Sequence, residues 1–225
     1  LRAAQAGVRS SLESLGVRVL YDYQIVYNGF AISADVAPLN RIGGLPNVVR
    51  IEPSHSFEVD LAKSVPFIFG GQTNADLGVD GTGVTIAIID TGIDYTHAAL
   101  GGSGVVADYT GNDPTIIEFG TFPTPKVIGG TDLVGEFYDA RGSSAPGGAC
   151  SDIPDPDPDP LDVNGHGSHV SGIAAGMSFD GFPQGVAPGA SLFAVKLFSG
   201  CASDGSASTS TANVVAAIEV ATDPD

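Results

Sequence analysis

An almost uninterrupted apolar run, Val84–Ile89, ends at an acidic residue, Asp90. A short run of this kind is typical of a strand covered on both faces, as in the centre of a parallel sheet. Open parallel sheets place their chemistry beyond the carboxyl ends of the strands, where loops and helix N-termini form a crevice. The run therefore predicts an α/β fold with Asp90 at its functional edge.

A second string, Asn164–His169, holds two histidines and precedes a stretch of small residues, Val170–Gly176. Small side chains let backbones approach closely, so this stretch predicts a tightly packed helix that begins near His166. Zinc proteases space their histidine pair around a glutamate, as H-E-x-x-H, and this string lacks that glutamate. The histidines therefore favour proton transfer over zinc binding.

Together the two strings resemble the aspartate and histidine boxes of the subtilisin-like serine proteases, and Gly185–Phe198 resembles the next core strand of that family. Aspartate before histidine, with serine last, is the order of subtilisin and not of chymotrypsin or the α/β-hydrolases. The resemblance implies a doubly wound parallel-sheet core in which Asp90 orients the general base, His166, while His169 is structural. It also implies a secreted serine endopeptidase whose substrates are polypeptides.

The serine box of that family, Gly-Thr-Ser-x-Ala-x-Pro, does not occur in the 225 residues. In subtilisin, loss of the serine lowers turnover by roughly 10⁶. We therefore expect this sequence to be inactive by itself and the activity to belong to a longer parent protein. Two alternatives are a non-catalytic binding or protease-inhibitory protein built from a propeptide and a partial core, and an acidic calcium-binding domain.

Residues 1–60 follow a different pattern, and we expect them to form a domain separate from residues 61–225. The predicted elements are a helix over 3–15, a hairpin of Val17–Tyr23 and Phe30–Ser33, a short helix over Ala34–Ile42 and a strand over Val48–Ile51. This order lacks only the first strand of a ferredoxin-like α+β unit.

Two strings in this region, Tyr27–Ala31 and Leu45–Pro53, resemble the inhibitory propeptide of the same protease family. The resemblance implies that residues 1–60 bind the peptidase part in cis, with a tail at about Glu52–Leu61 in the substrate cleft. A free-standing small α/β domain is the alternative. The second domain, 61–225, would then be the N-terminal part of the peptidase.

The segment after the predicted core strand in Gly185–Phe198 contains Asp204-Gly205-Ser206. The resemblance places it near an edge where a substrate peptide pairs as an added strand, so Gly205 and Ser206 are candidate substrate-binding residues. A plain Gly/Ser loop is the alternative. Ser210–Ala221 then predicts a helix with Val214, Val215 and Ile218 on its inner side.

Alternating aspartate and proline over 152–160 predicts an extended, solvated surface segment, because proline breaks helices and central strands. Closely spaced carboxylates also suit calcium, which is the alternative for this segment. Ala98-Ala99 stands where many family members have proline and a calcium-binding aspartate. We expect no cofactor in the chemistry, and a structural calcium ion stays open.

The net charge and the cysteine content narrow the binding partners and the cellular environment that we expect. A formal net charge of −17 disfavours nucleic acids and anionic membranes, which bind through lysine and arginine. No apolar run reaches the roughly 18 to 20 residues needed to cross a bilayer. Cys150 and Cys201 allow one disulfide in an oxidising compartment, and two unpaired, packed thiols are the alternative.

Overall fold

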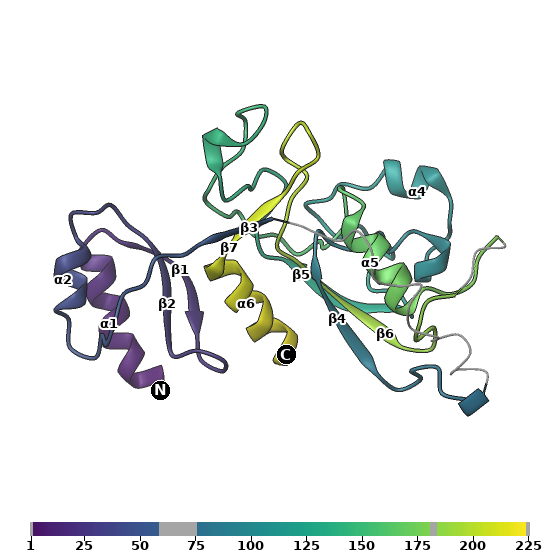
Figure 1. Cartoon of the computed structure of the whole chain (residues 1–225), viewed down its shortest axis with the longest axis horizontal. Coiled ribbons are helices and arrows are strands. Elements are labelled where there is room, and N and C mark those ends of the chain that lie inside the picture. The colour runs from purple at the N-terminus through teal and green to yellow at the C-terminus, as the bar shows by residue number, and fades with distance from the viewer. Residues whose placement is uncertain (1, 59–75, 181–183, 224–225) are drawn as a thin grey trace.

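The computed structural model describes residues 2–58, 76–180 and 184–223. A small N-terminal α+β unit packs beside a larger α/β unit, and the helix that lies between them in Figure 1 belongs to the larger unit. The larger unit carries Asp90 and His166.

The larger unit is built on a parallel sheet, as the sequence predicts. Its strand order is β4-β6-β5. In the pairing register both Asp90 and Asp132 stand beside Lys196, so the three strands end at the same level. The strands are β4 (Thr85–Asp90), β5 (Val127–Asp132) and β6 (Ser191–Lys196).

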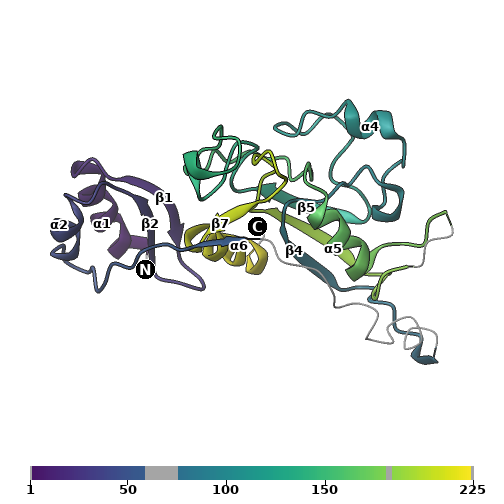
Figure 2. The same cartoon turned by 45° about the horizontal axis from the view of Figure 1, so that its top comes forward.

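Helices α5 (His166–Ala175) and α6 (Thr211–Thr222) cover opposite faces of this sheet. Alternate residues of β6 show this, because Leu192 and Ala194 belong to the core that includes Ala175 of α5. Phe193 and Val195 instead pack in the core that contains Ala216 and Ala217 of α6. Side chains that alternate along a strand point to opposite faces, so the sheet is covered on both sides (Figure 2).

The predicted helix over Ser210–Ala221 is confirmed, with Ser210 as the N-cap that accepts from the amide of Asn213. Its predicted inner side is partly wrong. Asn213, Ala216 and Ala217 are the buried residues, whereas Ile218 is 39% exposed. Small residues lie inward because the helix lies close to the sheet and the neighbouring unit.

Shorter elements complete the larger unit and lie mainly in the connections around the sheet. They are η1 (Ala98–Leu100), α4 (Val106–Thr110), η2 (Gly142–Ser144) and β7 (Ser208–Ser210).

The N-terminal unit consists of α1 (Arg2–Ser14), the antiparallel hairpin β1 (Arg18–Tyr23) and β2 (Gly29–Ser33), and α2 (Leu39–Gly43). The predicted helix and hairpin are confirmed, although α2 begins later than the predicted 34–42. Apolar side chains from these elements form a small core of their own, with Val8, Leu12, Val17 and Ile42 at its centre.

The predicted strand over Val48–Ile51 is wrong, because none of these residues lies in a strand. Only Val48 packs against the small core, while Val49 is 95% exposed. The next strand along the chain is β3 (Ser56–Glu58), which pairs antiparallel with β7 of the larger unit. The predicted tail thus lies partly in β3, and its residues 59–61 are outside the described residues.

The segment of alternating aspartate and proline is mostly exposed as far as Pro158, although Pro154 is buried, and it is buried at Asp159 and Pro160. Asp152 and Asp155 are exposed, as predicted. Asp159 is fully buried and accepts a hydrogen bond from the hydroxyl of Tyr95, and the carbonyl of Pro160 accepts from the amide of Ile93. The prediction of a surface loop is wrong there, because the chain turns inward against the loop that follows Asp90.

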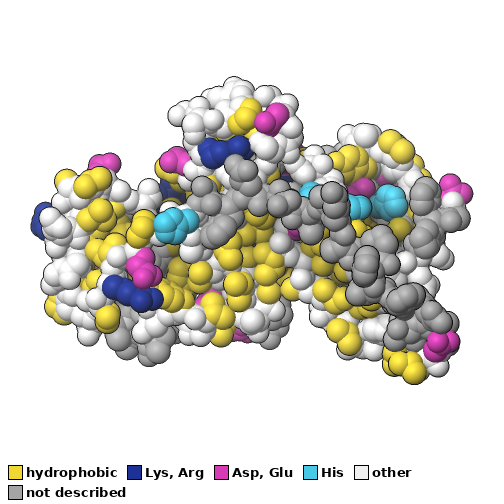
Figure 3. Space-filling model, viewed as in Figure 1, with side chains coloured by type: hydrophobic (Ala, Val, Ile, Leu, Met, Phe, Trp, Pro, Cys, Tyr) yellow, Lys and Arg dark blue, Asp and Glu magenta, His cyan; other side chains and the backbone are white. Residues whose placement is uncertain are grey.

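Cys150 and Cys201 form a disulfide across a separation of 51 residues. Lys and Arg side chains are separate spots on the face shown in Figure 3, in keeping with the acidic composition. In the described part of the chain, no helix is both long and apolar enough to cross a membrane.

Candidate active site

Asp90 and His166 lie against each other at the carboxyl edge of the sheet. Asp90 is the last residue of β4 and His166 the first of α5. The Oδ1 atom of Asp90 is 2.7 Å from Nδ1 of His166, within direct hydrogen-bond reach. The same oxygen accepts from the amide of Thr91 at 2.7 Å, which fixes the carboxylate.

The far side of the imidazole makes no hydrogen bond to the described residues. The side chain of His166 is 19% exposed, while its Nε2 atom is buried and has no hydrogen-bond partner among the described residues. A carboxylate on Nδ1 holds the ring in the tautomer whose Nε2 can accept a proton. In this arrangement His166 can act as a general base that takes a proton from a hydroxyl nucleophile.

A buried carboxylate that the sequence reasoning missed, Asp162, holds the start of α5. One of its oxygens accepts from Thr91 Oγ1 and from the amides of Asn164 and Gly165, each at 2.9 Å. The other accepts from the amide and hydroxyl of Ser168, at 2.8 and 2.6 Å. Asp162 is 1% exposed, so these bonds form away from water and fix the backbone on both sides of His166.

Close backbone contact joins the aspartate turn to the histidine helix. Thr91 Oγ1 accepts from the amide of Gly167 at 2.8 Å. A Cβ atom at Gly167 would lie 2.1 Å from the carbonyl oxygen of Gly92, and Gly92 itself has φ +111°. Both positions therefore require glycine. The predicted tight packing of the small-residue helix is confirmed.

Residues 81–224 match the subtilase family of peptidases. The chain belongs to the subtilase family.

Relatives of this subtilase include Bacillopeptidase F of Bacillus subtilis (strain 168), which is 30% identical over 80% of this chain and 12% of its own length. Minor extracellular protease Vpr of the same strain is 27% identical over 90% of this chain and 22% of its own length. Alkaline serine exoprotease A of Vibrio alginolyticus is 27% identical over 93% of this chain and 32% of its own length. The chain therefore spans about a third or less of each of these relatives.

A buried ion cluster in this subtilase stands beside Asp90. Lys196 ends β6 with its side chain fully buried, and its Nζ lies 3.0 Å from Asp132 Oδ2 and also pairs with Glu136. Burial alone would lower the pKa of the Lys196 ammonium, but the two carboxylates outweigh it and hold that pKa above its usual value. Nζ also donates to the carbonyl of Leu161, which ties the strand edge to the residue before Asp162.

The two candidate substrate-binding residues lie in a loop close to the histidine segment. The carbonyl of Gly205 accepts from Asn164 Nδ2 at 3.1 Å, and the hydroxyl of Ser206 bonds Asp204 and Arg141. The main chain that pairs as a strand lies slightly later, at β7. A substrate role for Gly205 and Ser206 stays a prediction.

No group of three or more His, Cys, Asp or Glu side chains that could hold a metal ion occurs within the part of this subtilase that the structure describes. Asp94, which follows the aspartate turn, instead accepts from the amide and hydroxyl of Thr96. A structural calcium ion stays a proposal, to be tested by whether chelation lowers the melting temperature.

Proposed function

We propose that this chain is the N-terminal portion of a secreted serine endopeptidase in which Asp90 orients His166 and His166 is the general base. The observation that carries the proposal is the 2.7 Å contact on Nδ1 of His166, combined with a buried Nε2 that no described residue occupies. In such a pair Nε2 takes the proton of the nucleophile and later donates it to the leaving amine. The carboxylate stabilises the imidazolium that forms in between.

The nucleophile in this proposal is a serine outside residues 1–225, so the chain alone hydrolyses no peptide. The names of the three relatives, a bacillopeptidase, an extracellular protease and a serine exoprotease, support proteolysis as the reaction class. The disulfide between Cys150 and Cys201 supports an oxidising, extracellular environment.

We further propose that residues 1–60 are an inhibitory propeptide docked on the peptidase part, 61–225. Glu219 of α6 supports this, because its carboxylate accepts from the backbone amides of Gln24–Tyr27 in the loop between β1 and β2. Tyr21 Oη donates to the carbonyl of Leu133 at 2.8 Å, and Tyr23 donates to the carbonyl of Ala212. Both rings pack in the core that lies between α6 and the sheet.

The pairing of β3 with β7 supports a second part of this proposal, that the tail of the propeptide occupies the place of a substrate. Ser56 pairs with Ser210, and Glu58 pairs with Ser208. The amide of Thr211 donates to the carbonyl of His55, which continues the contact by one residue. An extended peptide that adds a strand to an exposed edge obtains affinity from main-chain hydrogen bonds, whatever its side chains.

A serine-directed phosphonylating inhibitor tests the proposed chemistry on a chain extended beyond Asp225. We expect one serine to gain the mass of the inhibitor, and His166→Ala to abolish the labelling while His97→Ala, at an exposed histidine, preserves it. Absence of any labelled serine would exclude the proposed mechanism. If no serine is labelled and residues 1–225 inhibit a subtilisin at sub-micromolar concentration, the alternative hypothesis of a non-catalytic inhibitory protein is favoured.

A further inference from the structure

Strand β7 is held from the side by a segment that precedes it by some seventy residues. Ser208 and Thr209 are almost fully buried, yet within the described residues β3 is the one strand that pairs with β7. Its neighbour on the other side is the loop around Asp139. The Oγ atom of Ser208 donates to Asp139 at 2.7 Å, and the amide of Ala140 donates weakly to the carbonyl of Ser208.

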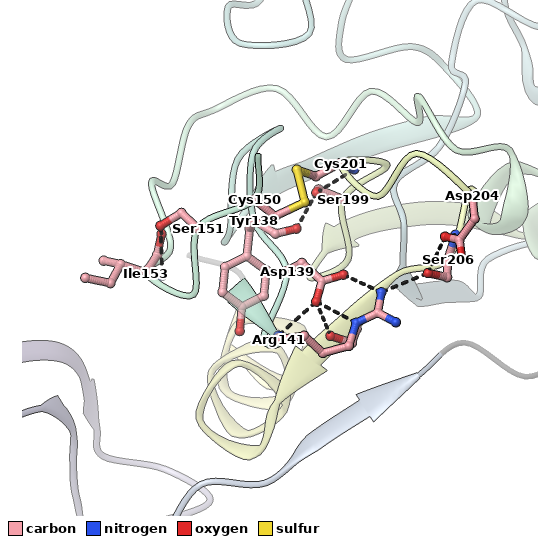
Figure 4. The surroundings of a disulfide bond; sticks show 11 residues. Tyr138, Asp139, Arg141, Cys150, Ser151, Ile153, Ser199, Cys201, Asp204 and Ser206 are labelled. Carbon is pink, nitrogen blue, oxygen red and sulfur yellow. Dashed lines mark hydrogen bonds and ion pairs between the residues drawn. A yellow bond between two sulfur atoms is a disulfide. The ribbon is translucent and has the colours of Figure 1, made fainter. Parts of the chain in front are cut away.

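Asp139 and Arg141 form a bidentate ion pair, and Arg141 also contacts Ser206, two residues before β7. Asp139 is 1% exposed and accepts from Nε, a terminal nitrogen and the backbone amide of Arg141 at 2.7 to 2.9 Å. The same terminal nitrogen also donates to Ser206 Oγ at 2.8 Å (Figure 4). Burial alone would raise the pKa of the Asp139 carboxyl, but hydrogen bonds from Arg141 and Ser208 hold that pKa below its usual value.

The disulfide joins the start of the loop that leads into β7, residues 199–207, to the end of the 137–151 segment. Cys201 lies near the start of the segment that leads from β6 to β7, and Cys150 lies at the end of the segment that begins with Asp139. The amide of Ser203 donates to the carbonyl of Pro146, so contacts continue between the disulfide and the ion pair. Figure 4 shows that the disulfide and Arg141 reach the segment before β7 at separate points, Cys201 and Ser206.

The anchoring segment is itself fixed to the core. Tyr138 is 2% exposed and packs in the same core as Ala216 and Ala217 of α6. Its carbonyl accepts from the hydroxyl of Ser199, and the amide of Asp139 donates to the carbonyl of Ser151. Asp139 is therefore held by the core. The loop that leads into β7, residues 199–207, is joined to the 137–151 segment by the disulfide and by the hydrogen bond from Arg141 to Ser206.

We propose that Asp139 and Arg141, together with the Cys150–Cys201 disulfide, are positioning residues that hold β7 extended for pairing with a peptide main chain. The inference rests on the proposed function and assigns a new role to the 137–151 segment. These groups touch β7 and its approach rather than the reacting atoms. Their loss should therefore weaken the binding of extended peptides much more than it slows the chemical step.

The first test is amide hydrogen exchange in the full 225-residue chain, comparing Asp139→Asn with Asp113→Asn. Asp113 is an exposed aspartate that accepts from Thr115 in its own turn, so the control loses the same charge elsewhere. We expect the amides of Ser208–Ser210 to exchange about tenfold faster in Asp139→Asn, the lower end of what losing a hydrogen bond to a charged group produces. Exchange in β4–β6–β5 should not change in either variant.

The second test is steady-state kinetics of the extended, matured protease. Asp139→Asn should raise KM for an extended peptide about tenfold and leave kcat within about twofold, while a single-residue ester too short to reach β7 shows neither change. If Asp139→Asn does not fold, Arg141→Lys replaces it, since lysine keeps the charge but not the bidentate geometry. It is expected to act in the same direction.

Unchanged exchange at β7 in a folded variant would overturn the proposal, and so would a fall in kcat with KM unchanged. The failure of the proposed function has a different signature. If the extended protein hydrolyses no peptide at all, the protease assignment fails, while exchange at β7 still decides whether Asp139 and Arg141 position that strand.

Discussion

Replacing Asp162 by asparagine should loosen the start of α5 and destabilise the chain. The carboxylate receives five hydrogen bonds from Thr91, Asn164, Gly165 and Ser168. Asparagine keeps one oxygen for the first three donors but turns an NH₂ group toward the two donors of Ser168.

The magnitude follows from those two bonds. A hydrogen bond to a charged group contributes about 1.5–3 kcal/mol, and an unsatisfied buried donor costs about 1–3 kcal/mol. The contributions overlap because both donors belong to Ser168, so we expect a loss of about 2–4 kcal/mol rather than their sum. Asp113→Asn removes the same charge at an exposed turn, where the retained oxygen can still accept from Thr115, and should change stability by less than about 0.5 kcal/mol.

The assay is urea unfolding followed by far-ultraviolet circular dichroism, since the chain contains no tryptophan. Amide exchange adds a local measure, because the amides of Asn164, Gly165 and Ser168 should lose protection while those of β6 keep it. A stability equal to that of Asp113→Asn, or full protection at these three amides, would refute the role given to Asp162.

Three further predictions concern the docked unit, the disulfide and a buried acid. Slight burial would raise the pKa of the Glu219 carboxyl. Hydrogen bonds from the amides of Gln24–Tyr27 outweigh this and hold that pKa below its usual 4.5. The docking contact should thus persist at neutral pH and weaken as the pH falls below 4.5 through the lowered pKa, and Glu219→Gln should remove this dependence and speed exchange of those amides at pH 7. Changing both Cys150 and Cys201 to serine should cost about 2–4 kcal/mol in urea unfolding, because the bond closes a long loop. Burial raises the pKa of Asp159 to about 7, so the folded chain holds a proton that the unfolded chain releases and its stability falls between about pH 4 and 7. Asp159→Asn should abolish that fall and be more stable than the parent chain by over about 1 kcal/mol at pH 8.

Each of these has a contradicting outcome. Docking that weakens with acid equally in Glu219→Gln would place the sensitive group elsewhere. A double serine variant as stable as the parent would mean that the loop is constrained without its disulfide. A pH profile of Asp159→Asn that parallels the parent would show that Asp159 is ionised in the folded chain.

Sequence patterns predicted the parts of the fold that are set locally. The apolar run of β4 and the small residues of α5 define a buried strand and a close-packed helix, so Asp90 and His166 could be placed at their ends before the structure. The disulfide could only be left open, because pairing depends on the distance between two loops. The sequence around Asp162 does carry a local signal, since an aspartate often accepts from amides two and three residues later, as it does here.

The failures concern contacts that no local pattern encodes. Val48–Ile51 has strand composition, but a strand needs a partner, and the chain pairs 56–58 with β7 instead. Asp159 is buried because the loop after Asp90 packs over it, which a pattern of aspartate and proline cannot show. Ile218 faces outward because the small residues Ala216 and Ala217 occupy the side of α6 that packs closely against the sheet.

The central claim is that Asp90 and His166 form a catalytic pair, and kcat/KM of the extended protein on a peptide tests it most directly. In subtilisin the corresponding single losses lower turnover by roughly 10⁴ to 10⁶. We predict losses of that order for Asp90→Asn and His166→Ala, with less than about tenfold change for His97→Ala. Peptide hydrolysis by His166→Ala at a rate close to that of the His97→Ala control would contradict the account.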